Sequence, residues 1–173
     1  MIEIALQITP HAVTLVPEKR QELTTEGGLE TSQKDSFLED SVAKLRAKNI
    51  AVALFLEPDQ QSIDFCKQHG ASIIEFHTGS VCIALNQATD DQTKAKIMQP
   101  LIEAAEYAHS QGIDVHLGHG INYDNAQWMQ LVPHVVEANI GHAIVAQAIE
   151  VGFKNAVQSM NSLINDSKHR PQV

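Results

Sequence analysis

The most distinctive chemical group in the sequence is a histidine between two glycines. His119 lies in HLGHG, directly after a run of apolar and β-branched residues. The glycines let the chain turn sharply and leave room for a substrate to approach the imidazole. Because imidazole titrates near neutral pH, we expect His119 to act as a general acid. The alternative is a hydrogen-bonded histidine that only stabilises the turn.

A carboxylate interrupts a second apolar run. Glu75 lies in ASIIEFHTG, where an ionised carboxylate costs desolvation free energy unless it is paired or faces water. Glu75 is therefore a candidate for proton transfer or for stabilising a developing positive charge. His77 follows two residues later, on the same face of a strand. The alternative is a buried acid that pairs with a structural lysine.

Two further segments have features of phosphate sites. The long loop VPEKRQELTTEGGLE (16–30) carries charged and hydroxyl side chains, namely Lys19, Arg20, Thr24 and Thr25. Long loops in compact domains are usually functional, although a solvated polar loop would have the same composition. In NIGHAIVAQA (139–148), a strand runs through Gly141 into a helix, and the free N–H groups of a helix N-terminus bind anions. Gly141 and His142 fit this function, on the signal of a single glycine.

The histidines also raise the question of a zinc site. His116 and His119 are three residues apart, a spacing that turns two strand side chains to opposite faces. Neither a carboxylate nor a cysteine completes a set of zinc ligands around them or around His77 and His142. We therefore expect no metal ion.

Short apolar runs must position these side chains. They are continuous rather than alternating, which is typical of parallel strands covered by helices on both faces. Five strands are expected, over residues 12–17, 50–57, 71–79, 113–120 and 135–142.

Helical periodicity separates the strands. Helices are expected within residues 35–49, in SIDFCKQHG ending at Gly70, and from Asp91 to Gln111. A last helix is expected to begin after Gly141 and to run through the segment that ends in SLI. Pro100 predicts a kink or an interrupted start in the third of these. The polar tail 165–173 is expected to fray. Cys66 falls in a helical pattern and Cys82 in a loop, and we expect both to be reduced.

Alternating strands and helices indicate an α/β fold, either an open doubly wound sheet or a closed (β/α)8 barrel. The candidate residues follow four different strands at their carboxyl ends. A barrel gathers loops from all its strands at one mouth, whereas an open sheet of flavodoxin type has its site between two neighbouring strands. The pattern therefore favours a TIM-type barrel, or part of one, as a single domain over residues 1–173.

Composition excludes several classes of partner. The net charge of −9 argues against non-specific binding to nucleic acid or anionic lipid. The sequence has no run of eighteen apolar residues and begins MIEIALQITP, which does not have the pattern of a signal peptide. We expect a cytoplasmic protein that binds small molecules.

The motifs VPEKRQELTTEGGL, IEFHTG, GHGINYDN and NIGHAI, in this order and spacing, resemble the pyridoxine 5'-phosphate synthase family along essentially the whole chain. The resemblance implies a (β/α)8 barrel that condenses 1-deoxy-D-xylulose 5-phosphate with 3-amino-2-oxopropyl phosphate. The products would be pyridoxine 5'-phosphate, inorganic phosphate and water. The resemblance implies neither a metal nor an organic cofactor.

The resemblance also implies roles for single residues. Thr24 would contact the deoxyxylulose phosphate, and Glu75 would stabilise a charged transition state. His119 would donate a proton. The aminoketone phosphate would be bound by three further residues, Gly120, Gly141 and His142. The implied steps are Schiff-base formation, loss of water and phosphate, and ring closure, which together need several proton transfers.

The sequence departs from the family at its start. Family members begin with further β/α units that carry a basic His/Arg cluster and a catalytic Glu, whereas Met1 aligns within a helix, so that Glu3 is a helix residue. We therefore expect about the last five of eight units, weak or no activity alone, and a homo-oligomer that covers the open strand edges. The alternative function is a non-catalytic phosphate-binding or assembly fragment of such a barrel.

Overall fold

The computed structural model describes residues 1–17, 27–31 and 36–172 of the chain. Thr24, Thr25, Lys19 and Arg20 lie outside the described residues, so the expectations for this loop stay predictions. The described helices of this chain are not long and apolar enough to cross a membrane.

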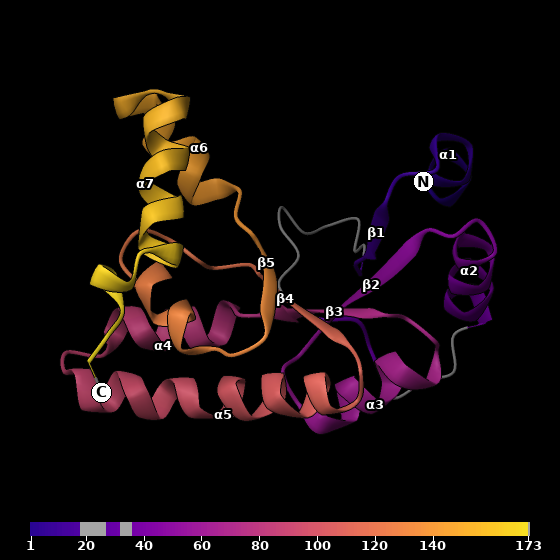
Figure 1. Cartoon of the computed structure of the whole chain (residues 1–173), viewed down its shortest axis with the longest axis horizontal. Coiled ribbons are helices and arrows are strands. Elements are labelled where there is room, and N and C mark those ends of the chain that lie inside the picture. The colour runs from indigo at the N-terminus through magenta and orange to yellow at the C-terminus, as the bar shows by residue number, and fades with distance from the viewer. Residues whose placement is uncertain (18–26, 32–35, 173) are drawn as a thin grey trace.

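Five parallel strands form one sheet in the order β1-β2-β3-β4-β5 (Figure 1). Their bounds are Ala12–Leu15, Ala51–Leu56, Ile73–His77, Asp114–Gly118 and Val135–Asn139. The order follows the sequence without a reversal, and a flavodoxin-like sheet requires a reversal at its switch point. The open doubly wound alternative is therefore wrong. The chain has an α/β fold with five parallel strands, each shorter than expected.

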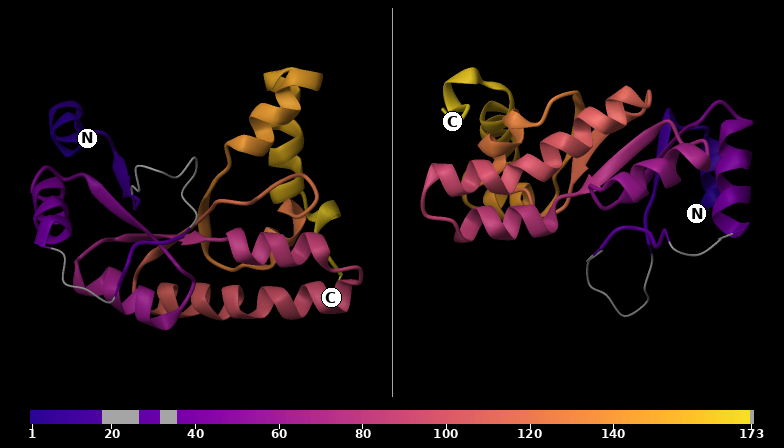
Figure 2. Two further views of the ribbon diagram at one scale, coloured as in Figure 1. Left: turned by 180° about the vertical axis from the view of Figure 1, so that it is seen from behind. Right: turned by 90° about the horizontal axis from the view of Figure 1, so that it is seen from below.

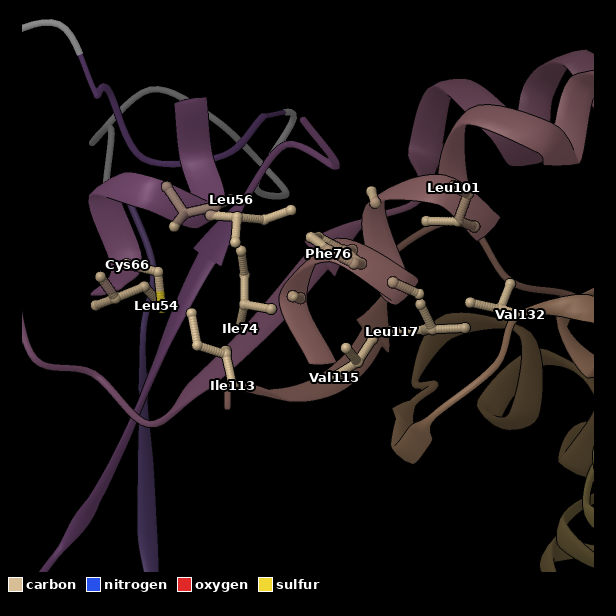
Figure 3. Packing of buried hydrophobic residues seen from close by; sticks show 14 of the residues in the cluster. Leu54, Leu56, Cys66, Ile74, Phe76, Leu101, Ile113, Val115, Leu117 and Val132 are labelled. Carbon is tan, nitrogen blue, oxygen red and sulfur yellow. The ribbon is translucent and has the colours of Figure 1, made fainter. Parts of the chain in front are cut away.

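The two faces of the sheet differ in chemistry. One face packs against the helices through apolar side chains of β2, β3 and β4, which include Leu54, Leu56, Ile74, Phe76, Val115 and Leu117 (Figure 3). The residues that alternate with them turn to the opposite face, where β2 contributes Ala53 and Phe55 and the strands β3 and β4 contribute polar side chains. Glu75 and His77 of β3 lie on this second face, where His116 of β4 is in register with Glu75. The alternation along β3 and β4 therefore places Glu75, His77 and His116 on one side of the sheet.

Helices follow the strands as the periodicity predicts, with some differences. Their bounds are α1 Ile2–Ile8, α2 Ser36–Arg46, α3 Gln60–Gln68, α4 Gly79–Gln87, α5 Asp91–Ser110, α6 His142–Val151 and α7 Phe153–Asn165. Two 3-10 turns cover Ala126–Leu131 and Ser167–His169. As expected, Glu3 is a helix residue. The helix α5 begins at Asp91 and continues through Pro100, so the interrupted start is not found.

Two expectations for the helices are wrong. Cys82 lies in α4 and is buried, not in a loop, because residues 79–87 form a helix directly after β3. The last helix is also not continuous. It breaks at Gly152, whose φ of 81° is left-handed and unsuited to a helix, so that α6 and α7 are separate elements. These two helices pack on each other and stand away from the sheet (Figure 2).

Candidate active site

The carboxylate of Glu75 is held from both edges of the sheet. Glu75 lies on the central strand β3 and is only 7% exposed. Thr14 Oγ1 of β1 donates a hydrogen bond to its Oε2 atom over 3.4 Å, and Asn139 Nδ2 of β5 donates to the same atom over 3.0 Å. Side chains from the two outer strands therefore meet at one atom of the central strand. The sheet curves around this carboxylate.

Burial and hydrogen bonding act on Glu75 in opposite directions. Desolvation raises the pKa of the carboxyl above its usual value of 4.5, and the bonds from Thr14 and Asn139 lower it by less. The negative charge of Glu137, on β5, raises the pKa of Glu75 slightly further. Among the described residues, the partners of Glu75 are thus a hydroxyl and an amide, and the expected alternative of a structural lysine is not found.

Glycine 118 gives the Glu75 side chain its space. A Cβ atom on Gly118 would overlap Glu75 Oε1 and would lie 3.0 Å from Cδ. Gly118 ends β4 and is in register with His77, two residues after Glu75. The first glycine of the GHG motif is therefore needed for the packing of the carboxylate, not only for a turn.

A second carboxylate, Glu57, lies directly after β2 and orients His77. Its Oε1 atom lies 2.8 Å from His77 Nδ1 and accepts a hydrogen bond from the N–H group of Gly28 over 3.1 Å. The His77 side chain is buried, whereas that of Glu57 is 44% exposed. Glu57 thus joins the imidazole of His77 to the end of the long loop.

The imidazole of His119 lies beside that of His77. The ring centroids are 4.9 Å apart, and the planes are inclined by 35°. His119 has a left-handed φ of 71°, and the hydroxyl of Thr78 donates to its carbonyl oxygen over 2.6 Å. The expected opposite orientation of His116 and His119 is wrong, because β4 ends at Gly118 and the left-handed residue turns His119 back towards His77.

A third glycine lies between the two imidazoles. Gly79 begins α4, and a Cβ atom built on it would lie 2.8 Å from His77 Nε2 and 2.9 Å from His119 Cδ2. Both rings therefore approach the backbone at this position. A side chain at residue 79 would displace at least one of them.

The candidate phosphate residues lie at two different places. Gly120 has a φ of 83° and packs on α4, since a Cβ atom there would lie 3.0 Å from that of Cys82. Its carbonyl oxygen accepts a hydrogen bond from Asn125 Nδ2 over 3.2 Å. Gly141 is the N-cap of α6, which begins at His142 as expected. A Cβ atom on Gly141 would meet nothing within 4 Å, so this helix end faces open space.

The remaining histidine, His116, has a different partner. Its Nδ1 atom lies 3.7 Å from Glu137 Oε1, and these two residues are in register on β4 and β5. A search of the described part of the chain finds no group of three potential metal ligands.

Sequence reasoning missed Thr14, Glu57 and Asn139. Thr14 and Asn139 lie on strands at the polar positions of an alternating pattern, whereas Glu57 directly follows the apolar strand β2. The alternation was the available signal for Thr14 and Asn139, and β2 offers no such signal for Glu57. Their partners lie between 20 and 64 residues away in the sequence, so the pairing itself could not be read from local spacing.

Comparisons with known proteins agree on one family. The family model described as "Pyridoxal phosphate biosynthesis protein PdxJ" matches residues 1–166. The protein named pyridoxine 5'-phosphate synthase from Idiomarina loihiensis is 41% identical over 97% of this chain and 68% of its own length. The protein of that name from Blochmanniella pennsylvanica is 42% identical over 97% of this chain and 67% of its own length. The protein of that name from Caulobacter vibrioides is 39% identical over the whole chain and 68% of its own length. The chain thus spans about two thirds of the length of these relatives.

Proposed function

Because the chain belongs to the PdxJ family of pyridoxal phosphate biosynthesis proteins, we propose that it carries out the chemistry of a pyridoxine 5'-phosphate synthase. The reaction would condense 1-deoxy-D-xylulose 5-phosphate with 3-amino-2-oxopropyl phosphate and release inorganic phosphate and water. The observation that carries this proposal is the buried carboxylate of Glu75, held by Thr14 and Asn139 on the face of the sheet that carries the histidines.

The fold proposed for this function is a TIM-type barrel, of which the five units correspond to the last five. In such barrels, four side chains from alternate strands form one layer inside the barrel. Thr14, Glu75 and Asn139 come from β1, β3 and β5, which are alternate strands, and they meet at one atom. This meeting supports the assignment of the three side chains to one layer of the proposed barrel. The fourth would come from a strand between β5 and β1 in the closed barrel.

The proposed catalytic residues are Glu75 and His119. A carboxylate on the concave face can stabilise the positive charge of a Schiff base, and its two hydrogen bonds fix the position of the charge. His119 would donate a proton to the leaving oxygen. Its position after the end of β4 supports this role, because barrel enzymes carry their catalytic residues at the carboxyl ends of strands.

The proposed phosphate-binding residues are Thr24, Gly120, Gly141 and His142. The open N-terminus of α6 supports the role of Gly141 and His142, since its free N–H groups can receive an anion there. With a net charge of −9, the protein needs such local positive potential to bind a phosphorylated substrate. Thr24 lies outside the described residues and is proposed on its motif alone.

We further propose that the protein is cytoplasmic and forms a homo-oligomer. β1 and β5 end the described sheet, and large apolar side chains are exposed on β5, α6 and α7, with Val136 67%, Ile149 86% and Phe153 62% exposed. Association would cover these surfaces.

Light scattering should show a mass above that of one chain, and a monomer with a cooperative thermal transition would contradict this.

The chain aligns with only part of the length of its relatives, and this partial coverage favours a second candidate function. A chain that aligns with 68% of a synthase could keep phosphate binding without the complete chemistry. In that case it would be a phosphate-binding or assembly fragment.

An assay with both substrates tests the proposed function against this alternative. The synthase proposal predicts weak formation of pyridoxine 5'-phosphate by the chain alone, loss of that turnover in His119→Ala, and retained substrate binding in the variant. Substrate binding without turnover, abolished in Gly141→Asp by charge repulsion, would instead favour the binding fragment. A chain that neither binds nor converts the substrates would contradict both.

A further inference from the structure

We propose that Glu57 and His77 form a carboxylate–imidazole pair that accepts a proton during the reaction in which His119 donates one. The proposal rests on the proposed function. His77 would be the base, and Glu57 would be a positioning residue that acts through it. The geometry of the pair, the burial of His77 and the position of Gly79 carry the inference.

The contact with Glu57 determines the tautomer of His77. Glu57 Oε1 accepts a hydrogen bond from the Gly28 N–H group and lies 2.8 Å from His77 Nδ1. An ionised carboxylate can only accept hydrogen bonds, so the proton between these atoms belongs to Nδ1. The neutral imidazole then carries its lone pair on Nε2.

The lone pair on His77 Nε2 is available to accept a proton. Nε2 is buried and has no hydrogen-bond partner among the residues that the structure describes. A buried acceptor without a partner costs free energy, and such an atom calls for an explanation in terms of catalysis or an absent partner. Glu57 therefore orients the ring so that an unused acceptor points away from the carboxylate.

The acceptor atom His77 Nε2 lies beside Gly79 and His119. The Cβ position of Gly79 is 2.8 Å from His77 Nε2 and 2.9 Å from His119 Cδ2, so the two imidazoles share one small space beside the backbone. His77 is 6% exposed, whereas His119 is half-buried. In the proposed step, a substrate bound at His119 would deliver its proton to Nε2 directly or through one water molecule.

The chemistry requires such an acceptor. Condensation with loss of water removes protons from nitrogen or carbon and gives protons to the leaving oxygen. In the proposed step, an N–H or C–H bond of the substrate breaks, its proton goes to His77 Nε2, and the electron pair stays on the substrate. The resulting imidazolium is balanced by the negative charge of Glu57, as in other carboxylate–histidine pairs.

The tautomer can be measured without turnover. Nitrogen NMR of the protein labelled at its histidines should show the proton of His77 on Nδ1 in the wild type and in Glu57→Gln, whose amide oxygen also accepts. In Glu57→Leu the signal should move toward the Nε2–H form. A wild-type His77 with its proton on Nε2 would overturn the proposal, whatever the activity.

Steady-state kinetics test the roles of His77 as base and of Glu57 as its positioning residue. Glu57→Leu and His77→Gln should lower kcat by about 100-fold or more with KM changed by less than about three-fold, and Glu57→Gln should fall between them and the wild type. Urea melts establish that each variant is folded, and Glu57 is exposed enough for substitution. As a matched control, Glu106→Gln removes the charge of a second carboxylate–histidine pair, Glu106 with His134 at 3.1 Å, and should leave kcat unchanged.

The outcomes separate this proposal from the proposed function. An active wild type with unchanged kcat in folded Glu57→Leu would overturn the base and leave the synthase activity standing. A wild type without turnover would overturn the synthase activity and with it the role of His77 as base. The NMR measurement would then still decide whether Glu57 sets the tautomer.

Discussion

Asn139 donates a hydrogen bond over 3.0 Å to the carboxylate of Glu75, although the two residues lie on strands that are not neighbours. β4 lies between β3 and β5, so the bond is possible only because the sheet curves and its polar side chains converge.

Removal of the Asn139 amide should destabilise the protein at neutral pH. In Asn139→Ala the buried carboxylate loses a donor, which typically costs about 1–3 kcal/mol in the free energy of unfolding when the acceptor is charged. Urea unfolding at pH 7 measures this. Asn155→Ala is the matched control, because Asn155 Nδ2 donates to the carbonyl of Val151 on an exposed helix and should contribute less than about 0.5 kcal/mol. Equal losses in both variants would contradict the role given to Asn139.

The stability difference between wild type and Glu75→Gln should depend on pH. Burial raises the pKa of Glu75 above 4.5, so the folded state binds the proton more tightly than the unfolded state. This stabilisation is present below the unfolded pKa and is lost as the pH rises through the folded pKa. The wild type should therefore lose stability relative to Glu75→Gln as the pH rises above 4.5. A constant difference in urea melts would contradict it.

Gly118→Ala should destabilise the fold by contact with Glu75. The added Cβ atom would overlap Oε1 of the carboxylate, and such overpacking costs about 1–3 kcal/mol. The loss should be smaller in a Glu75→Ala background, because that substitution vacates the space. Gly141→Ala, whose Cβ atom would meet nothing within 4 Å, is the control. The same loss with and without the Glu75 side chain would show that the contact is not the cause.

Both thiols should be unreactive in the folded protein. Burial raises the pKa of Cys66 to about 12 and that of Cys82 to about 11, and the reactive species is the thiolate. A chromogenic disulfide reagent at pH 8 should therefore modify neither cysteine in the native protein and both in urea. Rapid modification of Cys82 in the native state would contradict the packing of α4.

The sequence predicted the strands better than the contacts between them. Continuous apolar runs indicate buried parallel strands, and a charged residue such as Glu75 within one of them marks a position on the polar face. Its partners Thr14 and Asn139 are 61 and 64 residues away, and their convergence depends on the curvature of the sheet. No local pattern encodes that curvature.

The errors have local physical causes. α4 follows β3 with almost no connection, so its residues read as a continuation of the strand and Cys82 as part of a loop. Gly152 lies inside an apolar periodic segment, and the period alone does not show that its φ is left-handed. Similarly, strand alternation placed His116 and His119 on opposite faces, but the left-handed residue after β4 changes the direction of the second side chain.

The most direct test of the account is the joint measurement of pyridoxine 5'-phosphate and inorganic phosphate formed from the two substrates by the wild-type chain and by His119→Ala. We expect one phosphate released for each product molecule, and a rate at least about 100-fold lower in the variant. Equal rates in the two proteins, or phosphate release without pyridoxine 5'-phosphate, would contradict it.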